Sequence, residues 1–285
     1  MVSKLNNMKF FDSHCHLQFE AFDEIRDEIV KEMIKNNSKT INVGSSIENS
    51  ESGIKLSEKY SDTLISSVGI HPFHSLGFEI YGDEAEAHNL KIQYPQDLEK
   101  LRELAKNNVV KAIGECGIDY SYFKDLEGGT NDKEAWKQKQ IECFRFQIQL
   151  AKELNLPLIL HVRKEYILVL DILKEEGFEG KAVFHFFKGK INDFKEILKN
   201  ENYSFGFSGI ITYDSFMDEI IQEIPLNKLL IETDAPYVAP IPFRGELNRP
   251  EYVIKIAEKI ALIKGAGVEE ILEVSFKNAV NFFGI

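Results

Sequence analysis

Two histidines, His14 and His16, stand one residue apart near the start of the chain. They follow a short apolar segment that begins at Met8 and is typical of a β-strand. Because side chains alternate between the two faces of an extended chain, both imidazoles would project to the same side and reach one ion. Imidazole is a good ligand for zinc and related transition metals. The pair therefore predicts one edge of a metal site.

Residues of the kinds that bind metals recur where later apolar segments end. Together with the first pair they make a set of six: His14, His16, Glu115, His161, His185 and Asp234. Six ligands exceed the need of one closed tetrahedral site, whereas four histidines and two carboxylates suit two ions that share a bridging carboxylate. Taken singly, each residue is more often a hydrogen-bonded histidine, a helix cap or an ion-pair partner. Their joint position at strand ends is what favours a site.

Short β-rich segments alternate along the chain with longer segments of helical period. One such helix carries Ile141, Phe144 and Ile148 on a single face. The candidate strands are Lys9–Asp12, Thr40–Val43, Leu64–Val68, Val110–Gly114, Leu158–His161, Ala182–His185, Tyr203–Phe207 and Leu229–Glu232.

Strands that alternate with helices predict parallel pairing through crossover connections. Eight such units fit an α/β fold of the TIM (β/α)8 barrel type, in which all C-terminal strand ends open at one mouth. We therefore expect the metal site at those ends. The rival is an open doubly wound sheet, which is disfavoured because no glycine-rich phosphate loop follows the first strand.

The composition is that of a globular protein, with 285 residues of which 44% are hydrophobic. We expect one domain over residues 1–285, because barrels of this length are commonly single domains. No apolar run approaches the roughly 20 residues that span a bilayer, and the first seven residues lack the apolar core of a signal peptide. These features predict a cytoplasmic protein that binds no membrane, with its three cysteines reduced.

The formal net charge of -12 argues against a broad electrostatic surface for nucleic acid. Net charge concerns solubility and steering, however, and not the contents of a single pocket. An enzyme that takes single strands or strand ends into a cationic, metal-filled pocket therefore remains compatible with this composition.

Several further residues could contact a substrate at the mouth. His71 could bind a substrate phosphate or orient the site, and Arg163 could bind a phosphate or form a structural ion pair. Lys188 and Arg244 could also face the mouth. His74 and His88 are expected at the surface, in the first of two long connections. These connections, 72–95 and 120–134, are either substrate-facing loops or solvated insertions without a role.

The motifs around these residues resemble the TatD family of metal-dependent deoxyribonucleases, within the amidohydrolase-like metal hydrolases. The resemblance runs in order from about residue 9 to 284, with weaker matches at 208–212 and 244–250. The matching segments are Phe11–Leu17, Gly69–Pro72, Gly114–Tyr120, Pro157–Arg163 and Glu232–Tyr237. After His185 the chain departs from the family, with Phe186-Phe187-Lys188-Gly189 where small polar residues are usual.

This resemblance implies two divalent metal ions, which could be Mg, Mn or Zn. One ion would lie on His14, His16, Glu115 and Asp234, and the other on Glu115, His161 and His185. Glu115 would bridge the ions, and Asp234 would be the general base for the attacking water. Asp12, two residues before His14, is expected to be a structural partner of the site and not a ligand.

The implied reaction is hydrolysis of phosphodiester bonds in DNA by an exonuclease that acts on single strands or ends, with no obligate protein partner. Two alternatives stay open. One keeps the metals and changes the bond, as in an ester or amide hydrolase such as a deacylase of misacylated tRNA. The other is an inactive metal-binding scaffold that acts through partners.

Overall fold

The computed structural model describes residues 8–76, 96–121 and 130–285. Within them, eight parallel strands form one sheet in the order of the sequence, from β1 to β8. The strands are β1 (Phe11–Cys15), β2 (Lys39–Asn42), β3 (Leu64–Val68), β4 (Val110–Asp119), β5 (Leu158–Arg163), β6 (Ala182–Phe184), β7 (Tyr203–Phe207) and β8 (Leu229–Ile231). The sheet curls into a nearly closed barrel, so the predicted TIM-barrel class is confirmed.

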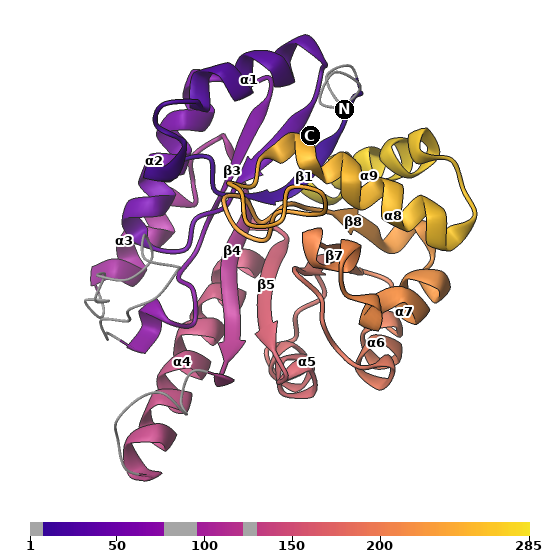
Figure 1. Cartoon of the computed structure of the whole chain (residues 1–285). Helices are drawn as coiled ribbons and strands as arrows, with labels where there is room; N and C mark the ends of the chain where they lie inside the picture. The colour runs from indigo at the N-terminus through magenta and orange to yellow at the C-terminus, as the bar shows by residue number, and fades with distance from the viewer. Residues whose placement is uncertain (1–7, 77–95, 122–129) are drawn as a thin grey trace.

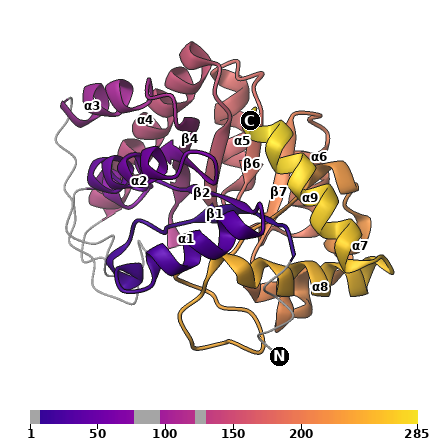
Figure 2. The ribbon, with the colours of Figure 1, turned by 90° about the horizontal axis from the view of Figure 1, so that it is seen from above.

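Helices alternate with the strands and lie around the outside of the sheet (Figures 1 and 2). They are α1 (Arg26–Lys35), α2 (Ile47–Lys59), α3 (Gln96–Leu104), α4 (Thr130–Leu154), α5 (Tyr166–Glu175), α6 (Ile191–Leu198), α7 (Asp218–Glu223), α8 (Val253–Lys264) and α9 (Val268–Phe283). Among the described residues, none of these helices combines the length and apolar character that crossing a membrane requires.

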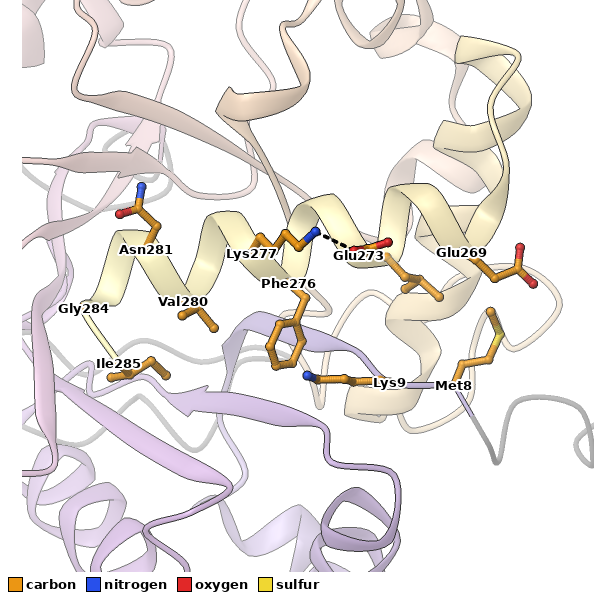
Figure 3. A pocket seen from close by; sticks show the side chains of 11 residues that line it. Met8, Lys9, Glu269, Glu273, Phe276, Lys277, Val280, Asn281, Gly284 and Ile285 are labelled. Carbon is orange, nitrogen blue, oxygen red and sulfur yellow. Dashed lines mark hydrogen bonds and ion pairs between the residues drawn. The ribbon is translucent and has the colours of Figure 1, made fainter.

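The barrel interior is filled by side chains from the N-terminal parts of the strands, including Phe11, Ile159 and Leu230. Residues of α9 join the same buried cluster, and the ring of Phe283 stacks on that of Phe11 at 5.7 Å. Helix α9 therefore covers the N-terminal end of the barrel. The ammonium of Lys9 lies 3.8 Å from the centre of the Phe276 ring on this helix (Figure 3).

Two bulges turn polar residues into the barrel where simple alternation would turn them away. Between Asp12 and Cys15 the register of β1 against β2 shifts, and β4 shifts against β5 between Ile113 and Cys116. Gly114, in the second bulge, has a φ of +139°, a conformation that a side chain would strongly disfavour. An extra residue in each strand changes which side chains face inward.

The barrel closes between β1 and β8 through few backbone contacts. Cys15 and Ala235 form an isolated parallel bridge, in which the backbone N–H of His16 donates to the carbonyl of Ala235 at 2.8 Å. Asp12 supplements this seam, because its buried carboxylate accepts from the backbone N–H of Thr233 at 2.8 Å and from the Thr233 hydroxyl. Asp12 thus has a structural role, beside the metal-ligand candidates.

Two of the expected strands differ from the structure by more than two residues at their C-terminal ends. The first strand begins at Phe11 and not at Lys9, and it contains His14 instead of ending before it. The fourth continues past Gly114 to Asp119, because the bulge lets the chain resume its pairing with β5. The later ends of both strands accompany bulges, which leave no trace in hydrophobic periodicity.

Candidate metal centre

Histidines from three strands converge on the carboxylate of Glu115, which extends from β4. Its Oε2 lies 3.5 Å from Nε2 of His14, from β1. Its Oε1 lies 2.6 Å from Nδ1 of His161 and 2.8 Å from Nε2 of His185, from β5 and β6. The two oxygens of one carboxylate therefore face two different groups of histidines, which is the arrangement of a bridging ligand.

The first group combines β1 with the segment that follows β8. Nε2 of His14 and Nε2 of His16 each lie 3.6 Å from Oδ1 of Asp234. The backbone of Asp234 has a φ of +58°, and its N–H donates to the carbonyl of His14 at 2.9 Å. Nδ1 of His16 lies 2.9 Å from the carbonyl of Val43, which orients Nε2 toward the carboxylate.

The second group contains two histidines, each with a carboxylate behind it. Nε2 of His161 lies 3.0 Å from Oδ2 of Asp119, and the other oxygen of Asp119 accepts from Ser121. Nδ1 of His185 lies 3.3 Å from Oε1 of Glu232. Such outer carboxylates fix the orientation of an imidazole and raise its basicity as a ligand.

Both candidate catalytic carboxylates remain ionised. Burial by itself would raise the pKa of Glu115, but the surrounding histidines, His185 first, hold it well below its ordinary value. Burial opposes ionisation of Asp234 as well, and contact with His16 and His14 keeps its pKa below the usual range. Both carboxylates thus place a negative charge within 3.6 Å of Nε2 of His14.

The surroundings shift the pKa values of His185 and His14 in opposite directions. Burial lowers the pKa of His185, but Glu115 and Glu232 outweigh it and raise the value to about 10. Burial and the nearby His185 lower the pKa of His14. His14 is fully buried, and neither of its ring nitrogens has a hydrogen-bond partner among the described residues.

A buried imidazole that makes no hydrogen bond is costly unless something else occupies its lone pair. Two groups that meet the spacing for a metal ion include Glu115: one adds His14 and His16, and the other adds His71 and His161. The residues present therefore fit metal ions. Their mixed nitrogen and oxygen donors suit several divalent cations.

His71 is placed to donate a hydrogen bond into the pocket. Its Nδ1 accepts from the backbone N–H of Phe73 at 3.2 Å, so the neutral ring carries its proton on Nε2. Nε2 lies 3.8 Å from Oε1 of Glu115. Burial and the nearby His161 hold the pKa of His71 well below its ordinary value, which keeps the ring neutral.

Arg163 lines the same pocket, whose volume is about 70 Å³. No carboxylate among the described residues pairs with it. Its guanidinium lies 4.5 Å from the centre of the Phe186 ring, and its Nη1 is 3.5 Å from the carbonyl oxygen of that residue. Of the two roles open to Arg163 from the sequence, the structural ion pair is therefore not observed.

The structure places other candidates differently. His74 was expected at the surface, and this was wrong: it is only 4% exposed and lines the pocket, in a short turn that packs behind His71. His88 and most of the connection 72–95 lie outside the described residues, as do 122–129 of the other connection. Lys188 is exposed and is not among the pocket-lining residues.

Cys15 and Cys116 are buried in the core between the barrel and its helices, and burial raises the pKa of both thiols. They are packing residues, and neither lines the metal pocket. Sequence reasoning gave no role to Asp119 or Glu232. Each stands within a segment that matched the family, but the sequence does not show which carboxylate lies behind which histidine.

A larger open groove, of about 1080 Å³, lies between α9 and the chain just before β1 (Figure 3). It is lined by apolar side chains such as Phe276 and Val280 and by a few charged ones, of which Lys277 and Glu273 pair with each other. Among the described residues that line it there is no histidine or cysteine, whereas the smaller pocket contains the whole set of candidate ligands except His14.

A parallel barrel with buried histidines and carboxylates at its C-terminal strand ends defines a class, the metal-dependent hydrolases with an amidohydrolase-like fold. The family described as TatD related DNase matches residues 11–284. The chain belongs to the TatD family.

Relatives match over nearly the whole length. The metal-dependent hydrolase YabD of Bacillus subtilis is 35% identical over 279 residues, which cover 96% of this chain and 99% of the relative. YcfH of Escherichia coli K12, also a metal-dependent hydrolase, is 30% identical over 98% and 97% of the two chains. The crystal structure of YjjV, a TatD homologue of E. coli, superposes with a TM-score of 0.79 at 26% identity and covers 97% of this chain and 98% of its own.

Proposed function

We propose that this protein hydrolyses phosphodiester bonds in DNA with two divalent ions, acting on single strands or strand ends. The observation that carries the proposal is the position of Glu115, whose two oxygens face His14 on one side and His161 with His185 on the other. A bridged pair of ions suits a reaction in which charge develops on both the attacking and the leaving oxygen.

One ion would be held by His14, His16, Glu115 and Asp234, and the other by Glu115, His161 and His185. When bound, such ions lower the pKa of a water and polarise the phosphoryl oxygen. Asp234 stays ionised and lies in a pocket where it can accept the proton of the attacking water. Glu115, which lies between the two groups of histidines, would fix their positions relative to each other.

Two further side chains are suited to the substrate. The guanidinium of Arg163 has no carboxylate partner in the described part of the chain and presents planar donors that match a phosphate. His71, with its proton on Nε2, can donate to a substrate oxygen. Both line the pocket that contains Glu115 and Asp234, which supports a phosphate ester as substrate.

A substrate panel tests the proposal. Protein stripped of metal and reloaded with Mg²⁺, Mn²⁺ or Zn²⁺ is given end-labelled single- and double-stranded DNA, RNA and aminoacyl-tRNA. We expect metal-dependent cleavage of DNA, strongest on single strands or ends. Asp234→Asn, which keeps the size of the side chain, should reduce kcat by at least about 100-fold, the contribution of a general base.

Other outcomes would replace the proposal. Preferential release of the amino acid from aminoacyl-tRNA would identify a deacylase. No turnover of any substrate by the reloaded protein would favour the inactive scaffold. DNA cleavage that survives complete removal of metal would contradict the metal-dependent mechanism itself.

A further inference from the structure

The chain has six arginines, and their partners divide them into two kinds. Four form ion pairs with carboxylates: Arg26, Arg102, Arg145 and Arg249. The other two, Arg163 and Arg244, pair with no carboxylate among the described residues. Arg163 is the last residue of β5, and Arg244 lies on the connection that follows β8, so both belong to the C-terminal side of the strands, where the metal centre lies.

Both of these arginines rest on an aromatic ring. The guanidinium of Arg163 is 4.5 Å from the centre of the Phe186 ring, and that of Arg244 is 4.4 Å from the centre of the Tyr213 ring. Stacking of this kind holds the guanidinium plane in place while its N–H donors stay free at the edge. A planar group fixed in this way is prepared for an oxyanion at little further cost in conformational entropy.

Arg244 lies on the connection that leads from the metal centre to α8. The same connection contains Asp234 and Tyr237, both of which line the metal pocket. It is tied down at two places. Asn248 donates from its Nδ2 to the carbonyl of Thr233 at 2.8 Å, and the backbone N–H of Ile241 donates to Oγ1 of Thr212 at 2.9 Å.

Thr212 ends a short 3-10 helix, Gly209–Thr212, that directly follows β7, and the next residue is Tyr213. The connections after β7 and β8 therefore form one platform beside the metal pocket. Arg244 is exposed on this platform, whereas Arg163 is half-buried inside the pocket. A substrate group that enters the pocket would contact Arg163, whereas a group that stays outside would contact Arg244.

We propose that Arg244 on Tyr213 is an outer phosphate subsite, which binds a second phosphate of a nucleic-acid strand whose reacting phosphate lies in the pocket beside Arg163. This proposal rests on the proposed function and sharpens it. The substrate is a strand of several nucleotides that leaves the metal centre across the connections after β7 and β8. A substrate with a single phosphate would use Arg163 alone.

Binding of a fluorescent ten-nucleotide oligothymidylate to metal-loaded protein, followed by anisotropy over a range of salt concentrations, tests the subsite. Arg244→Gln should raise Kd roughly five- to tenfold, as expected for loss of a charge-assisted contact. It should also reduce the slope of log Kd against log salt by about 0.7, the value for one phosphate contact on a single strand. Arg244→Lys should restore the slope but only part of the affinity, because it keeps the charge without the stacked plane.

Arg102→Gln is the matched control. It removes the same charge from α3, where Arg102 pairs with Glu153, and should leave both Kd and slope unchanged. The proposal is overturned if Arg244→Gln behaves like this control, or if the wild-type protein does not bind the oligonucleotide. Cleavage of the same oligonucleotide is scored separately. Binding that depends on Arg244 without cleavage would refute the proposed hydrolysis but keep the subsite.

Discussion

Glu232 and His185 lie 3.3 Å apart, although strand β7 separates the strands from which they extend. The carboxylate of Glu232 passes over β7 at Gly206, where an added Cβ would lie 2.1 Å from its Oε2. The seventh strand thus supplies space and no ligand. That space lets a carboxylate from β8 reach a histidine from β6.

Gly206→Ala should therefore displace Glu232 and loosen the hold on His185 without unfolding the barrel. We expect weaker metal binding, by about ten- to 100-fold, which is typical when an outer partner of a ligand is disturbed. Titration of the metal-free variant with Zn²⁺, followed by calorimetry, measures this.

Gly53→Ala is the control for that experiment. Gly53 lies inside α2, where an added Cβ would meet its neighbours no closer than 3.5 Å, so metal affinity should not change. If Gly206→Ala bound metal as tightly as the wild type, the present position of Glu232 would not be required for metal binding.

Asp119 should strengthen metal binding through its contact with His161. The change Asp119→Asn keeps the shape of a side chain that is fully buried but removes the charge 3.0 Å from Nε2 of His161. We expect a tenfold or greater loss of metal affinity, of roughly the size seen for outer carboxylates elsewhere, with normal circular dichroism. The exposed control Glu196→Gln should bind metal like the wild type. Equal metal affinities in Asp119→Asn and Glu196→Gln would show that Asp119 does not influence the metal site.

Asp12 should matter for stability at the seam between β1 and β8. Asp12→Ala leaves the backbone N–H of Thr233 without its acceptor, 2.8 Å away in the wild type. The free energy of unfolding should fall by about 1–3 kcal/mol, the cost of an unsatisfied buried donor. Urea denaturation at constant metal concentration measures it. Asp171→Ala, at an exposed position on α5, should change stability by less than about 0.5 kcal/mol.

Removal of metal should lower the melting temperature, because ions that bind only the folded state stabilise it by mass action. The ring nitrogens of His14 are buried without a hydrogen bond among the described residues, and Nε2 lies close to two carboxylates, so we expect the wild-type centre to depend on such an ion. Melting is compared before and after chelation, followed by reloading. In His14→Ala the difference should shrink. An unchanged melting temperature after chelation of the wild type would show that the centre holds no stabilising ion.

The sequence predicted the barrel and, to within two residues, the C-terminal ends of six of its eight strands, because each of these ends lies where an apolar segment meets polar residues. His161 and His185 illustrate the simple case. On β5, Ile159 lies in the barrel interior two residues before His161, as plain alternation requires. On β6 the same holds for Val183 and His185.

Alternation fails on β1 and β4. Phe11 and His14 both face inward although they are three residues apart, and so do Ala112 and Glu115. Each pair spans a bulge, and the bulge is what turns the ligand toward its ion. The partners of the histidines were also hidden, because Asp119 and Glu232 meet them only through the tertiary fold.

The central claim is that Glu115 bridges two ions, and the ratio of bound metal to protein tests it most directly. Metal-free protein is dialysed against Zn²⁺ or Mn²⁺, and bound metal is counted by elemental mass spectrometry in wild type and in Glu115→Gln. The account predicts two ions per chain in the wild type and at most one ion per chain in the variant, with normal folding. Saturation of the wild type at one ion, or two ions held equally well by Glu115→Gln, would contradict it.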